Sequence, residues 1–261
     1  MAKLQDLFTQ ARRTQGGGGM GFLGKNARES KAHAAALVVA FPRIASGSAE
    51  AAIKAGADGL LFTWNGKGEE QHEALKNEIS AAKAANNQVI TGLHITGGWN
   101  TLDREKLTQL KDLGAQYIIL PFDAPVRLLA LDVKELEKAV TVPVRKGEMY
   151  PLFIRNLSAF DHISAVLLDV ELSSEMGALT IEQSLQYRAV REAVHFPAFV
   201  RINDDLDEAE AYTLVALGVQ AVILNASDDE EKTRQNVKNV RAVLEKVHQD
   251  EQKEAPALPR P

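Results

Sequence analysis

Polar side chains that could carry chemistry stand near the ends of apolar runs in this sequence. A carboxylate or an imidazole can move protons, a lysine can form a Schiff base, and an arginine can bind an anion. Side chains two residues apart in a strand point to the same face, so pairs at this spacing predict shared surfaces. Run by run, the candidates are His94, Arg145 and Lys146, Asp169 and Glu171, Arg201 and Asn203, and Asn225.

The candidate catalytic residues are two carboxylates, a histidine and a lysine. Asp169 or Glu171 would act as the general acid or base, and His94 as a second proton-transfer or orienting group. Lys146 is the candidate for a Schiff-base lysine.

A second set of residues is expected to hold the substrate. Arg201, helped by Arg145 or the lysine beside it, would bind an anionic group. Asn203 and Asn225 would add hydrogen bonds, and Trp99 would wall a pocket. Together these residues predict a site for a small polar or anionic metabolite.

Each of these features also has a purely structural interpretation. Asp169, Glu171 and Arg201 could form an ion network between neighbouring strands, and His94 could be a hydrogen-bonded core histidine. Asp169 with Glu171 could also hold a divalent cation, but two carboxylates are few ligands for one, so no metal is assigned. The cofactor is left open.

The composition excludes several classes of protein. The 261 residues carry a formal net charge of −5 and include no cysteine, which rules out disulfides, thiolate metal sites and cysteine nucleophiles. A mildly acidic chain has no long-range attraction for nucleic acid or an anionic membrane. The first residues lack a signal-type apolar core, and no apolar run approaches the roughly 20 residues of a membrane span. We therefore expect a cytoplasmic protein with a small-molecule substrate, as a possible homo-oligomer.

Short apolar runs alternate with longer amphipathic stretches from residue 35 onward. This alternation is typical of a parallel sheet covered by helices. The predicted strands are residues 35–41, 59–64, 88–95, 116–122, 142–146, 165–171, 198–203 and 221–225. The predicted helices between and after them are residues 48–55, 69–85, 103–113, 133–140, 181–194, 207–217 and 229–248.

The joints between helices and strands repeat. Gly56, Gly114 and Gly218 each stand where a helix should end in a left-handed residue before the next strand begins. This repeated unit and the eight predicted strands together predict a single α/β domain, a (β/α)8 TIM barrel, over residues 35–248. Residues 1–34 would form an amphipathic helix and a glycine-rich connector, and residues 249–261 a flexible tail. Because every predicted strand follows the connector, the N-terminal helix is expected to be dispensable for folding.

The joints around Gly56 and Gly218 resemble those of the aldolase-type TIM-barrel superfamily. The resemblance implies an enzyme that acts at the C-terminal face of the barrel, where acid and base groups meet a small metabolite. Class I aldolases of this kind usually carry their lysine one strand later than Lys146. The segments after the seventh and eighth strands, 203–206 and 225–229, have carboxylates where phosphate-binding members have glycines. The usual phosphate or flavin-phosphate cradle is therefore expected to be absent.

Two alternatives remain open. The glycine-rich segment 18–24 is similar to one in flavin enzymes of the nitronate monooxygenase type, which implies an FMN-dependent oxidoreductase. The later glycine-rich motifs of those enzymes are missing from this sequence. The other alternative is a barrel without chemistry that binds or assembles through its N-terminal helix.

Overall fold

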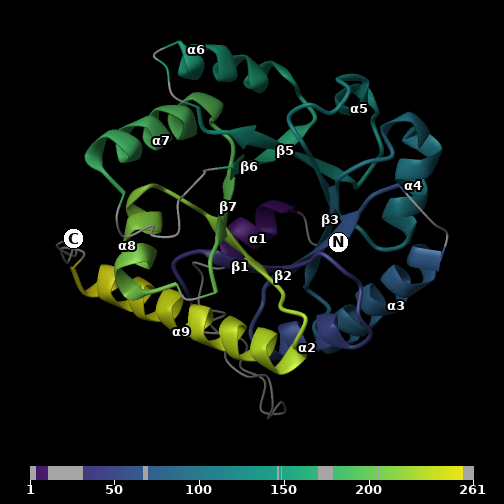
Figure 1. Cartoon of the computed structure of the whole chain (residues 1–261), viewed down its shortest axis with the longest axis horizontal. Helices are drawn as coiled ribbons and strands as arrows, with labels where there is room; N and C mark the ends of the chain where they lie inside the picture. Colours follow the sequence, from purple (N-terminus) through teal and green to yellow (C-terminus); the bar gives the residue numbers. More distant parts are fainter. Residues whose placement is uncertain are drawn as a thin grey trace, which may run out of the picture.

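Eight parallel strands form a closed barrel in which each strand pairs with the next and the last pairs with the first (Figure 1). The computed structural model describes residues 4–10, 32–66, 70–145, 147, 149–169, 179–204 and 206–254. The predicted (β/α)8 barrel is confirmed. The strands are β1 Ala36–Phe41, β2 Gly59–Trp64, β3 Ile90–Ile95, β4 Tyr117–Leu120, β5 Glu137–Pro143, β6 Ile163–Asp169, β7 Ala198–Ile202 and β8 Ala221–Asn225.

Helices form the outer layer of the barrel (Figure 1). Among the described residues, none of them is long and apolar enough to cross a membrane. The last helix runs to Glu254, further than the sequence predicts, and the rest of the expected tail lies outside the described residues. The helices of this layer are α2 Ser48–Ala55, α3 Glu70–Ala85, α4 Arg104–Asp112, α5 Arg127–Ala130, α6 Tyr150–Ile154, α7 Ile181–Val194, α8 Glu208–Ala216 and α9 Glu230–Glu254, with short 3-10 turns η1 Trp99–Thr101 and η2 Arg155–Ala159.

The fifth repeat differs from the prediction. The expected helix 133–140 and strand 142–146 are replaced by β5, which begins at Glu137 and ends at Pro143. Leu136, Ala139 and Val140 fit a helical spacing as well as a strand, so the sequence is ambiguous here. Pairing with β4 on one side and β6 on the other decides the outcome. Position 145 therefore lies two residues beyond the strand.

The predicted helix-to-strand joints are confirmed by the backbone. Gly56, Gly114 and Gly218 have φ values of 118°, 114° and 74°, in the region that glycine adopts without a steric penalty. Each chain reversal delivers the following strand to the N-terminal end of the barrel.

Apolar side chains fill the barrel interior. The ring of Tyr117 stacks on Phe199 with centroids 5.9 Å apart. A Cβ on the neighbouring Gly92 would lie 2.2 Å from that ring, so a glycine in β3 makes room for it. The residues of this interior cluster on the strands are Ala36, Val38, Ala40, Leu61, Ile90, Tyr117, Ile119, Ala139, Ala165, Leu167, Phe199, Ala221 and Ile223.

The N-terminal helix α1, Leu4–Gln10, belongs to this interior (Figure 1). Leu4, Leu7 and Phe8 are buried in the same cluster, and the Phe8 ring lies 5.0 Å from Phe199. The backbone N–H of Leu4 donates to a carboxylate oxygen of Glu137, where β5 begins, at 3.0 Å. Helix α1 therefore closes the N-terminal end of the barrel, and the expectation that it is dispensable is not supported.

A group of charged side chains ties α9 to the same end. Asp58 accepts hydrogen bonds from His33 at 2.7 Å, from the backbone N–H of Leu37 at 2.7 Å and from Arg241 at 3.0 Å. Arg241 also donates to Glu245 at 2.9 Å. Burial alone raises the pKa of the Asp58 carboxyl, but the charges and hydrogen bonds of His33 and Arg241, with the Leu37 amide, leave it lowered. This end of the barrel is held by paired charges.

Candidate functional site

Polar side chains from opposite sides of the barrel meet at its C-terminal mouth. His94 on β3 and Arg201 on β7 stand two residues beyond Gly92 and Phe199, on the interior face. Arg201 donates to the Oδ1 of Asn225, the last residue of β8, at 3.2 Å. Its other terminal nitrogen lies 3.4 Å from His94 Nδ1. The guanidinium therefore bridges the mouth.

Asp169 completes this group as the last residue of β6. It stands two residues beyond the interior Leu167 and is exposed. Its charge acts on both neighbours, since it favours the charged forms of Arg201 and His94. The sequence-based face assignments for Asp169, His94 and Arg201 thus agree with the structure.

The electrostatics of the mouth keep the histidine neutral. Burial, and then the positive charge of Arg201, lower the pKa of His94 from 6.5 to about 4, although Asp169 acts in the opposite direction. An arginine N–H can only donate, so Nδ1 of His94 is the acceptor and the ring proton sits on Nε2. That N–H is a hydrogen-bond donor for a molecule in the mouth.

The structural alternative, an ion network that joins Arg201 to Asp169, is not formed by these two residues. No ion pair joins the two within 4.0 Å, and Glu171 lies outside the described residues, so its part in such a network is not described. Burial lowers the pKa of the Arg201 guanidinium, and Asp169 opposes that shift through its charge. The guanidinium is held by neutral partners and keeps N–H donors for a further acceptor.

The other sequence candidates are not all brought into this group. Asn203 is exposed just after β7, and Arg145 is exposed beyond β5 because that strand ends earlier than predicted. Lys146 lies outside the described residues. Trp99 lies in η1 and packs on the core between strands and helices rather than on the interior cluster. Its backbone carbonyl accepts a hydrogen bond from Arg127.

Two threonines near the mouth were missed by the sequence analysis. Thr63 pairs in register with His94 and lines a hollow of about 450 Å³ beside β1 and β2. Thr141 of β5 is placed two residues beyond the interior Ala139, and its buried hydroxyl has no hydrogen-bond partner among the described residues. The two-residue spacing reveals Thr63. It could not reveal Thr141, because this residue lies between the predicted helix 133–140 and the predicted strand 142–146.

The usual phosphate position is occupied by the chain's own carboxylate. At the start of α9, Asp229 accepts hydrogen bonds from the backbone N–H groups of Glu231, at 2.9 Å, and Lys232, at 3.4 Å. Lys232 also lies 3.7 Å from Asp204, which follows β7. The amides that could bind an anion at this helix start are therefore already used.

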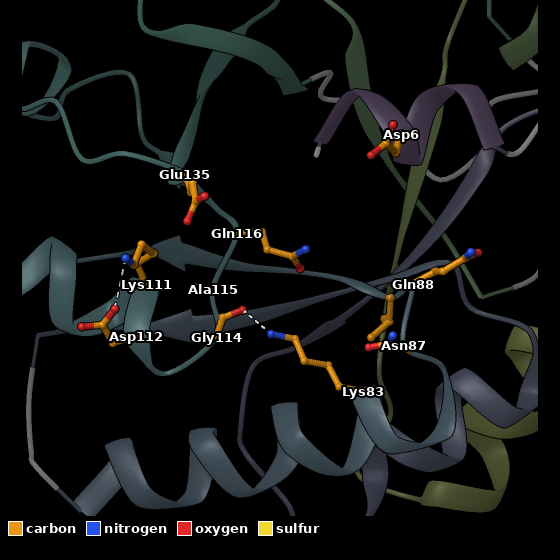
Figure 2. A pocket seen from close by; sticks show the side chains of 11 residues that line it. Asp6, Lys83, Asn87, Gln88, Lys111, Asp112, Gly114, Ala115, Gln116 and Glu135 are labelled. Carbon is orange, nitrogen blue, oxygen red and sulfur yellow. Dashed lines mark hydrogen bonds and ion pairs between the residues drawn. The ribbon is translucent and has the colours of Figure 1, made fainter. Parts of the chain in front are cut away.

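A second hollow, of about 850 Å³, lies at the opposite end of the barrel (Figure 2). Lys83 donates to the carbonyl of Gly114 at 3.1 Å, and Lys111 pairs with Asp112 at 3.2 Å. Both lysines thus stand where α3 and α4 end, and they complement the negative helix termini. Since its cations are engaged by the protein, this hollow is a weaker candidate than the mouth. No group of three His, Asp or Glu suited to a metal occurs among the described residues.

The closed barrel of eight parallel strands, with helices around it, defines a TIM-barrel fold. No protein-family model and no curated protein matches the sequence. Solved tryptophan synthase structures do match the fold. One from M. tuberculosis, in its aminoacrylate- and BRD0059-bound form, is 14% identical with a TM-score of 0.61, and the match covers 94% of this chain and 99% of that chain.

Two further structures extend the comparison. A mutant tryptophan synthase alpha-subunit from the hyperthermophile Pyrococcus furiosus is 13% identical with a TM-score of 0.58, over 82% of this chain and 98% of that chain. A cube-shaped, highly porous protein cage, designed by fusing symmetric oligomeric domains, gives 13% identity and a TM-score of 0.58, over 83% and 74%. At these identities the likeness concerns the fold, and function must be argued from the site.

Proposed function

We propose that the chain is an enzyme that binds a small carboxylate-bearing metabolite in the C-terminal mouth and moves a proton on it. The observation that carries this proposal is the environment of Arg201. Its guanidinium is half-buried inside the barrel, yet it donates to the neutral Asn225 and His94 and to no carboxylate of the described residues. A desolvated cation with remaining donors is suited to bind an anion.

The surrounding groups divide the chemistry. Asp169 would be the general base, because it is a carboxylate at the mouth whose charge acts on both His94 and Arg201. The Nε2–H of the neutral His94 would donate to a substrate oxygen that gains charge. Asn225 would orient the guanidinium. In this arrangement the substrate carboxylate binds Arg201, and the reacting carbon lies between Asp169 and His94.

Lys146, Glu171, Arg145, Asn203 and Trp99 are further candidates of the same proposal. Their positions in the sequence follow strands β3, β5, β6 and β7, whose ends form the mouth. Arg145, Asn203 and Trp99 would line the substrate pocket. Glu171 could act as a second base, and Lys146 as a Schiff-base lysine.

A carboxylate is favoured over a phosphate at this mouth. Asp229 uses the N–H groups at the start of α9, and the nearby carboxylates Asp204 and Asp228 already engage Lys232 and Arg43. A doubly charged phosphate would meet repulsion where other barrels supply amides. The same repulsion disfavours a flavin phosphate at this position. The remaining alternative, assembly through α1, conflicts with the burial of Leu4, Leu7 and Phe8.

Calorimetry with a panel of small mono- and dicarboxylates and phosphate monoesters would test the proposal. We expect binding of one or more carboxylates, with at least about tenfold weaker binding in Arg201→Gln, since a charge-assisted hydrogen bond contributes about 1.5–3 kcal/mol. Asp169→Asn should retain binding and lose turnover. Arg188→Gln, on the outer surface of α7, is the matched control. Preferential binding of phosphate monoesters, or unchanged binding in Arg201→Gln, would overturn the proposal.

A further inference from the structure

Large apolar side chains are exposed on, or directly beside, three elements that pack against one another. Helices α6 and α7 are neighbours on the outer layer (Figure 1). The 3-10 turn η2 packs against both. We call their solvent side the α6–α7 face. Its exposed side chains are Met149 at 71%, Leu152 at 58%, Phe153 at 60%, Phe160 at 40%, Ile181 at 81% and Leu185 at 62%.

The helices that carry this face are apolar on two sides. Helix α7 buries Tyr187, Val190 and Val194 against the barrel, yet it exposes Ile181 and Leu185, one turn apart. A helix that covers a barrel needs only one apolar stripe, and its other side is normally polar. A second stripe therefore calls for a second partner surface.

The extent of the face fits one half of a protein interface. Each exposed side chain offers roughly 100 Å² of apolar surface, so the face amounts to about 600 Å². That is at the upper end of what monomers expose, and a standard interface buries about 800 Å² on each partner. A narrow polar rim around the face would supply the rest of the area that each partner of a standard interface buries.

The rim contains charges of both signs. Arg155 follows α6, while Glu182, Arg188 and Glu192 lie on α7, and Arg188 pairs with Glu192 at 3.3 Å. The two positive and two negative charges of this rim cancel, so the rim does not favour a strongly acidic or a strongly basic partner. A twofold axis can instead place the acidic positions of one copy against the basic positions of the other. The apolar centre matches the composition of homodimer interfaces.

We propose that the α6–α7 face is a twofold dimer interface between two copies of this chain. The inference is independent of the proposed function, because it uses no residue of the mouth. It has one consequence for the mouth. Met149 and Ile181 stand near the starts of α6 and α7, which follow β5 and β6, so the interface lies on the Asp169 side of the barrel opening.

Sedimentation velocity over about 1 to 100 µM protein tests the proposal, a range that spans the usual affinities of such interfaces. We expect a dimer that Phe153→Glu and Leu185→Glu convert to a monomer at the same concentrations. Val126→Glu is the matched control, since Val126 is 65% exposed on the N-terminal side of α5, outside the face. A wild-type monomer throughout, or a dimer that survives both substitutions, would overturn the proposal.

Cross-linking keeps the test decisive if a glutamate variant fails to fold. The sequence contains no cysteine, so Leu185→Cys and Ile181→Cys introduce single reactive thiols. A short bis-maleimide should link two chains through either of these positions and should not link Val126→Cys. Equal linking at all three positions, or none at the two α7 positions, would contradict the assigned face.

Discussion

Arg241 and Arg201 are half-buried arginines at opposite ends of one barrel, and their partners differ. At the N-terminal end, Arg241 donates to the carboxylates of Asp58 and Glu245. At the C-terminal mouth, Arg201 donates to the amide of Asn225 and the neutral ring of His94. The first arginine has its counter-charges within the fold. The second forms no ion pair within 4.0 Å among the described residues, and only the charge of Asp169 acts on it.

The same contrast holds for the openings themselves. The N-terminal end is closed by α1, whose Leu7 and Phe8 reach the interior cluster. The mouth is lined instead by partly exposed polar groups such as Asp169 and Thr63. Apolar contacts and paired charges at the N-terminal end stabilise the fold. The C-terminal mouth can therefore keep polar groups that contribute little to stability.

The largest expected effect concerns the closed end. Replacing Leu7 and Phe8 together by alanine should lower the free energy of unfolding by about 5 kcal/mol or more, because each buried truncation costs about 2–5 kcal/mol. Urea unfolding followed by circular dichroism measures this. Gln5→Ala, on the exposed side of the same helix, is the control and should change stability by less than about 0.5 kcal/mol. Equal stability of the double variant and the control would show that α1 does not close the barrel.

Asp58 should have the next largest effect. Asp58→Ala leaves Arg241, His33 and the Leu37 amide without their acceptor, so we expect a loss of about 3 kcal/mol near neutral pH. Because the folded pKa of Asp58 is lowered, its contribution is present above the ordinary value of 3.8 and is lost as the pH falls below it. The acid limb of a stability–pH curve should therefore be shallower in Asp58→Asn. An unchanged acid limb would mean that this carboxylate does not hold the N-terminal end.

The titration of His94 tests the open end. Its pKa is lowered, so the folded state resists protonation, and stability should fall as the pH decreases from 6.5 toward about 4. The full shift corresponds to about 3 kcal/mol, and solvent screening of the partly exposed ring reduces the expected loss to about 2 kcal/mol. This loss should be absent in His94→Gln. By NMR, the ring should titrate near 4 in the wild type, and Arg201→Gln should raise that value only in part, since burial is the larger cause. A titration midpoint near 6.5 for His94 in the wild type would contradict a buried ring that stays neutral.

The smallest effect should come from Arg201, and it sharpens the comparison most directly. Arg201→Ala should cost less than about 1 kcal/mol, because no buried carboxylate loses its partner. Arg241→Ala, the matched variant, should lower the free energy of unfolding by about 3 kcal/mol or more, since two carboxylates lose their partner. Chemical denaturation of the two variants side by side measures the difference. Equal losses would mean that Arg201 is also a structural residue and would remove the main support for the anion site.

The amino-acid sequence by itself determines the repeating pattern of this fold and much of its mouth. Alternation of apolar runs with amphipathic stretches predicts the parallel barrel, and glycines such as Gly56 mark the joints, because both depend on local periodicity and backbone conformation. The two-residue spacing also places Asp169, His94 and Arg201 on the interior face, since side-chain direction in a strand follows from the chain alone.

Only the tertiary structure decides what depends on contacts between distant segments. Residues 137–143 become a strand because β4 and β6 offer ladders on both sides, although their apolar spacing also fits a helix. Leu7 and Phe8 form an apolar stripe whose partner, the interior around Phe199, is assembled from many strands. Arg201 has Asn225 and His94 as hydrogen-bond partners and forms no ion pair with Asp169, because the closing of the barrel sets distances across the mouth that no local pattern encodes.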